Sequence, residues 1–446
     1  MPQLYSYAAL AEKFRAGESS PSRELDRRIA LFHELEPRLK SFVHVDLDAA
    51  RAAAATSDQR WRARQPLSPI DGMPIGIKDI IETYDMPTGQ GTPVWEGTQT
   101  RRDAASVQAL REAGAVIFGK TTTTEYASTE PLHSTTNPHD PARTAGGSSS
   151  GSAAAVGAGI LPAALGTQVV GSTLRPASYC GCVGFKPTFG ALNRSGSFDH
   201  LSQSCLGILA ASPEDAWHVA SAIASRVGGD PGHPGLNGPL LPPPPHKPHR
   251  LAVVETAGWT KASEGARQAL HGARTRLRDL GIETIDRRAD ADIEALEVAL
   301  VDATPVTFRI FEWELVWPLG TYARLHGDKL TEAMHKRLAS ARTMSLDDYR
   351  TALARRAAIR ARHAFVGARY DALLLLGATG AAPSGLAWTG DPALNIPASL
   401  LGAPAVALPL LRDGPMPLGL QLIGLPDHDD ALMATADWVW RHYQRG

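Results

Sequence analysis

A chain of 446 residues could hold two to four domains, although large α/β enzymes of this length often form one continuous core. Its 45 basic and 46 acidic residues nearly cancel, which argues against the basic surface of a nucleic-acid-binding protein. The N-terminus lacks a basic segment followed by an apolar one, and no apolar run reaches the roughly 18 residues that span a bilayer. We therefore expect a soluble, cytoplasmic protein that binds neither nucleic acid nor membrane.

Helices and strands alternate along the first half of the chain. Hydrophobic periodicity predicts three helices, then a strand, an amphipathic helix and a second strand, at residues 5–15, 22–38, 49–64, 73–81, 104–115 and 116–122. Such alternation predicts an α/β protein in which helices cover the faces of a sheet. Three cysteines follow, Cys180, Cys182 and Cys205, and their spacing matches neither a redox pair nor a zinc site, so we expect buried, small apolar side chains.

One segment interrupts the alternation. Residues 228–250 are so rich in proline and glycine that they can form neither a helix nor a central strand. We interpret them as an exposed connection between two halves of one core. Beyond them we expect a strand, two helical regions, three further strands and a terminal helix containing Trp438 and Trp440, with the first six of these at 251–255, 264–280, 290–368, 370–378, 403–411 and 418–424. The expected organisation is a single domain over 1–446, divided into an N-terminal helical segment, a core, the connection, and a second half of the core with a helical insertion, at 1–65, 66–227, 228–250 and 251–446.

A glycine- and serine-rich run, GGSSSGSAAAVGAG, occupies residues 146–159. Its composition is typical of a linker, but it leads directly into an apolar stretch, so we interpret it as a tight turn that opens a buried helix. The N–H groups at such a helix start suit an anion or a developing oxyanion. Ser149 matches the G-x-S-x-G elbow in form only, because loop residues rather than a strand precede it.

Two further residues have the character of a catalytic pair. Ser172, with Gly171 beside it, follows the strand-like stretch ALGTQVV. A serine nucleophile needs a base within hydrogen-bond reach. Lys78 lies in the otherwise apolar stretch GMPIGIKDI, and burial would lower its pKa from about 10.4 toward a value at which it can act as a base. The alternative for Lys78 is a solvated residue at a strand end.

Together these stretches resemble the amidase signature family. That family carries a G-G-S-S-G/S-G segment, a nucleophilic serine 24 residues after its first serine, a lysine in a K-D strand and a G-x-K-P-T motif. Ser148 and Ser172 are 24 residues apart here, IKDI supplies Lys78, and GFKPTFG occupies 184–190. The resemblance covers most of the chain and is weakest over 228–370.

The resemblance implies a fold and a set of roles. The fold would be α/β, the amidase signature fold, with a large twisted mixed β-sheet covered by helices on both faces. Ser172 would be the nucleophile, Lys78 the base, and Ser148 the bridging serine, with a cis peptide bond between Gly147 and Ser148. No metal or cofactor would be needed. The oxyanion would be held by the N–H groups of Val169, Val170, Gly171 and Ser172.

The sequence departs from the family pattern around the nucleophile. The family commonly reads GTDTGGSIR where this chain has GTQVVGSTLR, so Gln168 replaces an acid and Val170 replaces a glycine. Arg175 is displaced by one position, with Leu174 in its usual place. These changes put ion-pair support for the loop in doubt. The apolar residues favour a hydrophobic or aryl substrate.

The implied function is an amidase that cleaves small-molecule amides and also carbamates (urethanes) and esters, as a monomer or homodimer. One alternative is the amidase subunit of a tRNA-dependent amidotransferase, which would need partner subunits. Another is a catalytically inactive binding protein of the same fold. For the substrate pocket we expect Tyr126 and Trp388, and a helix at 306–318 whose aromatic residues could equally belong to the core: Phe308, Phe311, Trp313 and Trp317.

Overall fold

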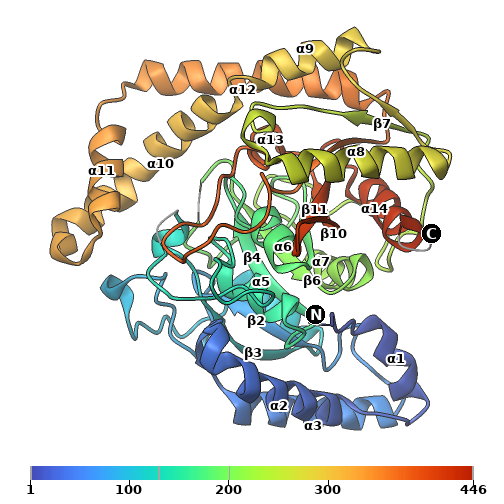
Figure 1. Ribbon diagram of the computed structural model, residues 1–446. Helices are drawn as coiled ribbons and strands as arrows, with labels where there is room; N and C mark the ends of the chain where they lie inside the picture. Colours follow the sequence, from blue (N-terminus) through green and yellow to red (C-terminus); the bar gives the residue numbers. More distant parts are fainter. Residues whose placement is uncertain (1–2, 129–130, 200, 444–446) are drawn as a thin grey trace.

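A single mixed sheet organises the protein (Figure 1). The computed structural model describes residues 3–128, 131–199 and 201–443. Within these residues the sheet has 11 strands in the order β1-β3-β2-β4-β6-β5-β10-β11-β9-β7-β8. The strands are β1 (Phe42–Val45), β2 (Pro74–Lys78), β3 (Val116–Thr121), β4 (Ala163–Gln168), β5 (Val183–Lys186), β6 (Cys205–Ala210), β7 (Arg250–Val253), β8 (Glu283–Ile285), β9 (Ala372–Leu376), β10 (Ala405–Asp413) and β11 (Met416–Ile423).

The two halves of the chain form the two halves of this sheet. Strands β1 to β6 precede the proline-rich connection and lie together, while β7 to β11 follow it and lie together. The halves join where β5 pairs antiparallel with β10, with Lys186 opposite Ala405. Residues 228–249 contain neither helix nor strand, as predicted, so the connection runs outside a sheet that continues from one half to the other.

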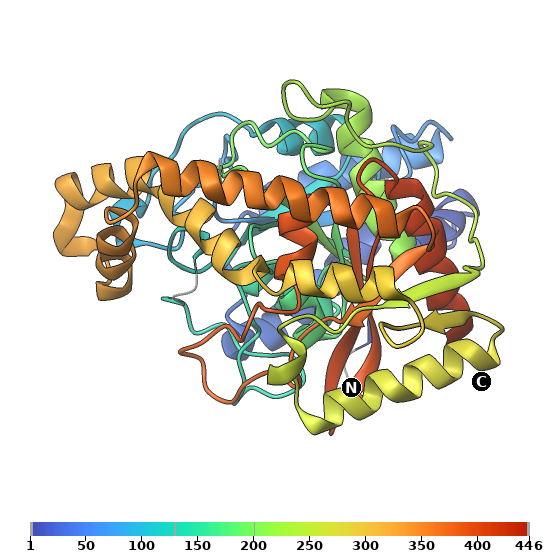
Figure 2. The same cartoon turned by 90° about the horizontal axis from the view of Figure 1, so that it is seen from above.

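Helices cover both faces of the sheet (Figures 1 and 2). Strand residues alternate between the two faces: Ile208 belongs to one hydrophobic cluster and its neighbour Leu209 to another. The predicted fold class is therefore confirmed. The helices are α1 (Ala8–Arg15), α2 (Pro21–Leu39), α3 (Leu47–Arg62), α4 (Ala105–Glu112), α5 (Ser150–Gly157), α6 (Leu174–Cys180), α7 (Pro213–Val227), α8 (Glu264–Asp279), α9 (Ala291–Leu300), α10 (Ala303–His326), α11 (Glu332–Ala341), α12 (Leu346–Gly367), α13 (Ile396–Leu401) and α14 (Asp429–Tyr443).

Two groups of helices lie at opposite ends of the molecule in Figure 1. Helices α2 and α3, drawn in blue, pack against each other, and α10, α11 and α12, drawn in yellow to orange, form a second group.

None of the helices in the described ranges is both long and apolar enough to cross a membrane. The three cysteines are buried and free, as expected.

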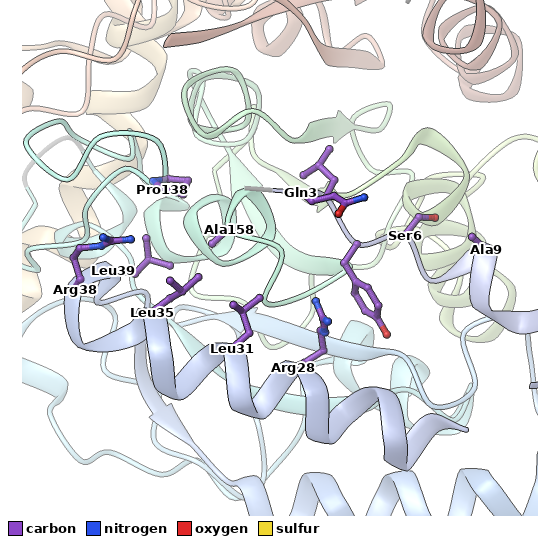
Figure 3. Close-up of a pocket in the computed structure, with 12 residues that line it drawn as sticks. Gln3, Ser6, Ala9, Arg28, Leu31, Leu35, Arg38, Leu39, Pro138 and Ala158 are labelled. Atoms are coloured by element: carbon purple, nitrogen blue, oxygen red, sulfur yellow. The ribbon is translucent and has the colours of Figure 1, made fainter. Parts of the chain in front are cut away.

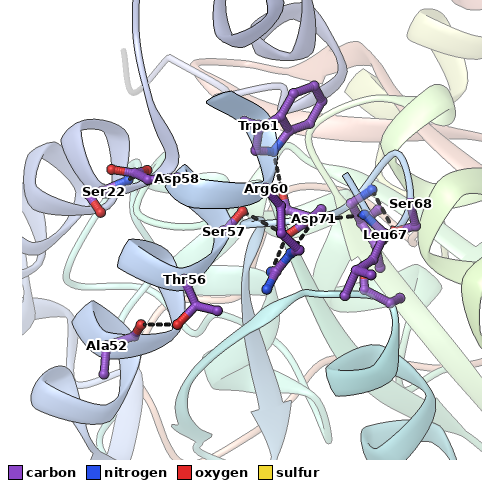
Figure 4. Close-up of polar contacts among 12 residues, drawn as sticks. Ser22, Ala52, Thr56, Ser57, Asp58, Arg60, Trp61, Leu67, Ser68 and Asp71 are labelled. Carbon is purple, nitrogen blue, oxygen red and sulfur yellow. Dashed lines mark hydrogen bonds and ion pairs between the residues drawn. The ribbon is translucent and has the colours of Figure 1, made fainter. Parts of the chain in front are cut away.

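Asp71, just before β2, attaches helix α3 to the core (Figure 4). Its carboxylate accepts hydrogen bonds from Ser57 Oγ at 2.7 Å, from Arg60 Nε at 2.7 Å and from the Leu67 N–H at 2.8 Å. Trp61 Nε1 donates to the Asp71 carbonyl oxygen at 3.0 Å. Helix α3 is thereby fixed beside β2, the strand that ends at Lys78.

Candidate active site

The residues predicted to be catalytic come from three adjoining elements. Lys78 is the last residue of β2, and Ser172 lies four residues beyond the end of β4. Because β2 and β4 are parallel neighbours, with Ile77 opposite Leu165, their carboxyl ends meet at the same edge of the sheet. Ser148 lies in the turn that opens α5, a helix whose residues are all buried. The glycine- and serine-rich run is therefore a turn into a buried helix, as predicted.

Lys78 is completely buried and hydrogen-bonded to hydroxyl groups. Its Nζ donates to Ser148 Oγ at 2.7 Å and to Thr167 Oγ1 at 2.8 Å. Burial lowers the pKa of Lys78 from 10.5 to about 7, an effect that the negative charge of Asp199 partly opposes. The solvated alternative is thus wrong. An amine with this pKa is substantially neutral near pH 7 and can accept a proton.

The turn at Ser148 is held in place by its neighbours. The peptide bond between Gly147 and Ser148 is cis, as predicted. Ser149 Oγ donates to the carbonyl oxygen of Thr167 and accepts from its N–H, both at 3.3 Å, so Ser149 braces the turn against β4 and does not cap α5. The Ser149 N–H donates to the carbonyl oxygen of Ser172 at 3.3 Å, which ties the two serine segments together.

Gln168 supports the loop that would hold the oxyanion. Its Oε1 accepts hydrogen bonds from the N–H groups of Thr173 at 3.0 Å and Leu174 at 3.1 Å, and its Nε2 donates to Ser399 Oγ at 3.1 Å. Both polar ends of the amide therefore have partners. The loop from Val169 to Ser172 is held by neutral hydrogen bonds where the family pattern has an acid, which answers the doubt that the sequence raised.

Arg175 supports the opposite side of the same site. Its guanidinium is fully buried and donates from Nε to the carbonyl oxygen of Thr389 and from Nη2 to that of Gly147, each at 2.8 Å. Burial lowers the pKa of Arg175. The displaced arginine thus fixes the turn at Ser148 through backbone carbonyls.

We expect Gln168→Ala to lower kcat by about 10- to 100-fold with a smaller change in KM, because two N–H groups next to Ser172 would lose their acceptor. Steady-state kinetics on any turned-over amide measures this effect. Gln168→Glu is the matched control. A glutamate carboxylate at this position still accepts from the two N–H groups at the start of α6, so most of the activity should remain. Equal losses in the two variants would contradict this role.

An aromatic cavity of about 670 Å³ opens beside the site and reaches Val169. Tyr126 lines it, and so do residues of α10. Helix α10 also belongs to the core, because Ile310 and Phe311 are buried. Sequence reasoning missed Asp199 and Tyr322 here. The aromatic residues in the wall are Tyr126, Phe198, Phe311, Trp313, Trp317, Tyr322 and Tyr349.

The structure corrects the prediction for Trp388. Its side chain is not part of the cavity wall, and the residue is 53 % exposed. The next residue, Thr389, packs directly on the turn before Ser148. A side chain at Gly147 would collide with it, because an added Cβ would lie 2.7 Å from Thr389 Cγ2. The loop therefore contacts the serine turn through Thr389.

A second cavity, also about 670 Å³, lies between the N-terminal segment and α2 (Figure 3). Arg28, Leu31 and Leu35 of α2 line one side of it, with Gln3 and Ser6 on the other. Lys78, Ser148 and Ser172 line neither cavity, but only the aromatic cavity reaches Val169, three residues before Ser172. Across the described ranges, no group of three or more His, Cys, Asp or Glu side chains is placed to hold a metal ion.

This fold and this group of side chains define a hydrolase that acts on amide bonds. The chain belongs to the amidase signature family, because the family model described as Amidase matches residues 26–433.

Known proteins resemble the chain over nearly its whole length. It is 31 % identical to one of the subunits of the glutamyl-tRNA(Gln) amidotransferase of Chloroflexus aurantiacus, over 98 % of this chain and 96 % of the relative. Among solved structures, it is similar to the crystal structure of an amidase, with a TM-score of 0.86, 27 % identity, and 98 % and 99 % of the two chains covered. A structure concerned with the origins of an s-triazine catabolic enzyme matches with a TM-score of 0.85, 26 % identity and 98 % of both chains covered.

Proposed function

We propose that the protein is an amidase that forms an acyl-enzyme on Ser172 through a proton relay of Ser148 and Lys78. The observation that carries this proposal is the fully buried Lys78 Nζ at 2.7 Å from Ser148 Oγ. Neutral Lys78 takes the proton of Ser148, and Ser148 takes that of Ser172 as Ser172 Oγ attacks the carbonyl carbon. The N–H groups between Val169 and Ser172 stabilise the oxyanion.

The relay then runs in reverse. Lys78 returns its proton through Ser148 to the departing nitrogen, the C–N bond breaks, and the amine leaves. Water attacks the acyl-enzyme with the same relay as base and releases the acid and free Ser172. A carbamate or an ester follows the same route with an alcohol as leaving group in place of the amine.

The cavity supports a bulky or aryl substrate. Seven aromatic side chains and the apolar Val169 form much of its wall, and an apolar group bound there is removed from water at a gain of roughly 25 cal/mol per Å². Small aliphatic amides cannot use this surface. We therefore propose that aryl or bulky amides, and aryl carbamates, are the favoured substrates, turned over by a monomer or homodimer.

An activity screen tests this function. Anilides, small aliphatic amides, primary amides, aryl carbamates and aryl esters are compared by kcat/KM, with Ser172→Ala protein as the background. We expect the anilides and aryl carbamates to exceed the aliphatic amides by about 10-fold or more. If small aliphatic amides are the best substrates, the assigned specificity is wrong, and if no compound is hydrolysed above background, the amidase function itself is wrong.

The second candidate is the amidase subunit of a tRNA-dependent amidotransferase. The observation in its favour is the 31 % identity to such a protein over nearly the whole chain. The aromatic cavity and the balanced charge of the chain support the stand-alone amidase instead. Co-purification with partner proteins, with amidase activity only in that complex, would favour the amidotransferase. The presence of Lys78, Ser148 and Ser172 together speaks against an inactive binding protein.

A further inference from the structure

Asp199 is a buried carboxylate in the wall of the aromatic cavity, in the stretch between β5 and β6. The residue is only 6 % exposed, and within the described part of the chain neither of its carboxylate oxygens has a hydrogen-bond partner. A carboxylate removed from water without a partner is costly, so proteins rarely keep one unless a ligand satisfies it. Asp199 is therefore a candidate for contact with the substrate.

The charged groups nearest to Asp199 are already engaged. Arg194 donates from Nη1 to the backbone oxygen of Asp199 at 3.3 Å, but its Nε pairs with Asp230 Oδ2 at 2.7 Å. Lys78 is hydrogen-bonded to Ser148 and Thr167. Within the described part of the chain, neither side chain therefore forms an ion pair or hydrogen bond with the carboxylate of Asp199.

The other acid of the cavity, Glu314, differs from Asp199 because its carboxylate has hydrogen-bond partners. The carboxylate of Glu314 accepts hydrogen bonds from the Ser202 N–H at 2.8 Å, from Ser202 Oγ, and from Tyr349 OH at 2.9 Å. Arg356, which donates to Ser202 Oγ at 2.9 Å, adds a balancing positive charge. Glu314 is therefore part of the wall, and of these two acids Asp199 is the one free to bind a ligand.

The surroundings of Asp199 indicate the chemistry of that ligand. The same cavity is walled by Tyr126, Trp313, Trp317 and Tyr322, with the Tyr126 ring stacked on that of Tyr322 and the Trp313 ring on that of Tyr349. Aromatic rings attract cations, and a carboxylate without a partner in an aromatic cavity suits an organic cation with an apolar body. Resting on the amidase function proposed above, we propose that Asp199 binds a protonated nitrogen of the substrate and so selects amides that carry an amine beside an apolar or aromatic group.

Binding of such a cation should change the pKa of Lys78, the proposed base. The charge of Asp199 raises the pKa of Lys78, while burial lowers it more strongly. A bound cation offsets the charge of Asp199, so Lys78 loses its proton more readily in the complex. Other charged groups already have partners. Asp79, beside Lys78, pairs with Lys120 at 3.1 Å, and Glu314, Arg356 and Arg194 have the hydrogen-bond partners given above. For a cationic substrate, the acidic limb of kcat should therefore lie at lower pH than that of kcat/KM.

Matched substrates test the inference. Anilides of ω-aminoalkanoic acids of graded chain length are compared with anilides in which a methyl group replaces the ammonium group. We expect the wild-type enzyme to favour the cationic member of the best pair by about 10- to 100-fold in kcat/KM, the range of a charge-assisted hydrogen bond. Asp199→Asn should reduce that preference to within about 3-fold, mainly through KM, and should bring the two acidic limbs together.

The matched control is Glu314→Gln, which removes the same formal charge from the same cavity and should leave the cation preference in place. If wild type shows no preference, or if the preference survives in Asp199→Asn, the inference is overturned although the amidase function stands. If neither anilide is hydrolysed above the Ser172→Ala background, the amidase function fails. Calorimetry then tests the cation site separately. We expect 4-phenylbutylamine to bind Ser172→Ala protein more tightly than 4-phenylbutanol does. Equal binding of the two compounds, or amine binding unchanged by Asp199→Asn, would overturn the inference.

Discussion

Replacement of Ser172 by alanine is expected to lower kcat/KM for every substrate by about 10⁴-fold or more, because the acyl-enzyme can no longer form. The fold should be retained, since the change removes one hydroxyl group and leaves the neighbouring hydrogen bonds of Gln168 intact. Kinetics together with thermal unfolding measures both effects. In the wild-type protein, mass spectrometry after reaction with a slowly deacylating aryl carbamate should locate the adduct on Ser172.

Ser149→Ala is the matched control for this prediction. Ser149 is also buried and is the serine that formally fits the elbow pattern, but its hydroxyl forms its hydrogen bonds with the backbone of Thr167. We expect a loss of activity within about 10-fold, together with a modest loss of stability. An adduct on any residue other than Ser172, or a Ser149→Ala variant as inactive as Ser172→Ala, would contradict the assignment.

Lys78→Met should be the second strongly inactivating change, with kcat lowered by about 10³-fold or more because the relay loses its base. In the wild-type enzyme, kcat/KM for a neutral substrate should fall as the pH drops through about 7, where Lys78 becomes protonated. The full pH profile of wild type and variant measures this effect. A wild-type profile that stays flat well below pH 7 would exclude Lys78 as the base.

The same pKa shift predicts how Lys78→Met changes stability. In the unfolded chain Lys78 binds a proton below about pH 10.5, whereas in the folded protein it does so only below about 7. As the pH falls from 10.5 to 7, the unfolded state gains a proton that the native state lacks, so wild type loses stability over that window. Between pH 10.5 and pH 7, wild type should therefore lose stability relative to the variant by roughly 2–4 kcal/mol. Urea unfolding at the two pH values measures it.

The strands and the positions of Lys78 and Ser172 could be predicted because the local sequence pattern determines them. Lys78 ends an apolar strand, and Ser172 follows a second strand that turns out to be its parallel neighbour, so both arrive at one edge of the sheet. The strand predicted over 73–81 is shorter in the structure, where β2 ends at Lys78. The chain turns there, and the N–H of Ile81 donates to the carbonyl oxygen of Lys78.

The pocket could not be predicted in the same way. Asp199 lies outside any helix or strand, so no periodicity indicates its side-chain direction. It shares its cavity with α10, which begins more than 100 residues further along the chain. Trp388 illustrates the opposite error: an aromatic residue in a glycine-bounded loop is typical of a binding site, but here Thr389 makes the contact with the serine turn. Gln168 departs visibly from the family pattern, yet only the folded loop identifies its three hydrogen-bond partners.

The two halves of the sheet contribute differently to the candidate site. Lys78, Ser148 and Ser172 all belong to the half of the sheet built before the connection, whereas α10, which supplies much of the aromatic wall, belongs to the half built after it. The halves meet along the short ladder between β5 and β10. Mutations in α10 can therefore alter the aromatic wall while Lys78, Ser148 and Ser172 stay unchanged. Thr389 and Ser399 are exceptions within the second half, because they hold the turn at Ser148 and the side chain of Gln168.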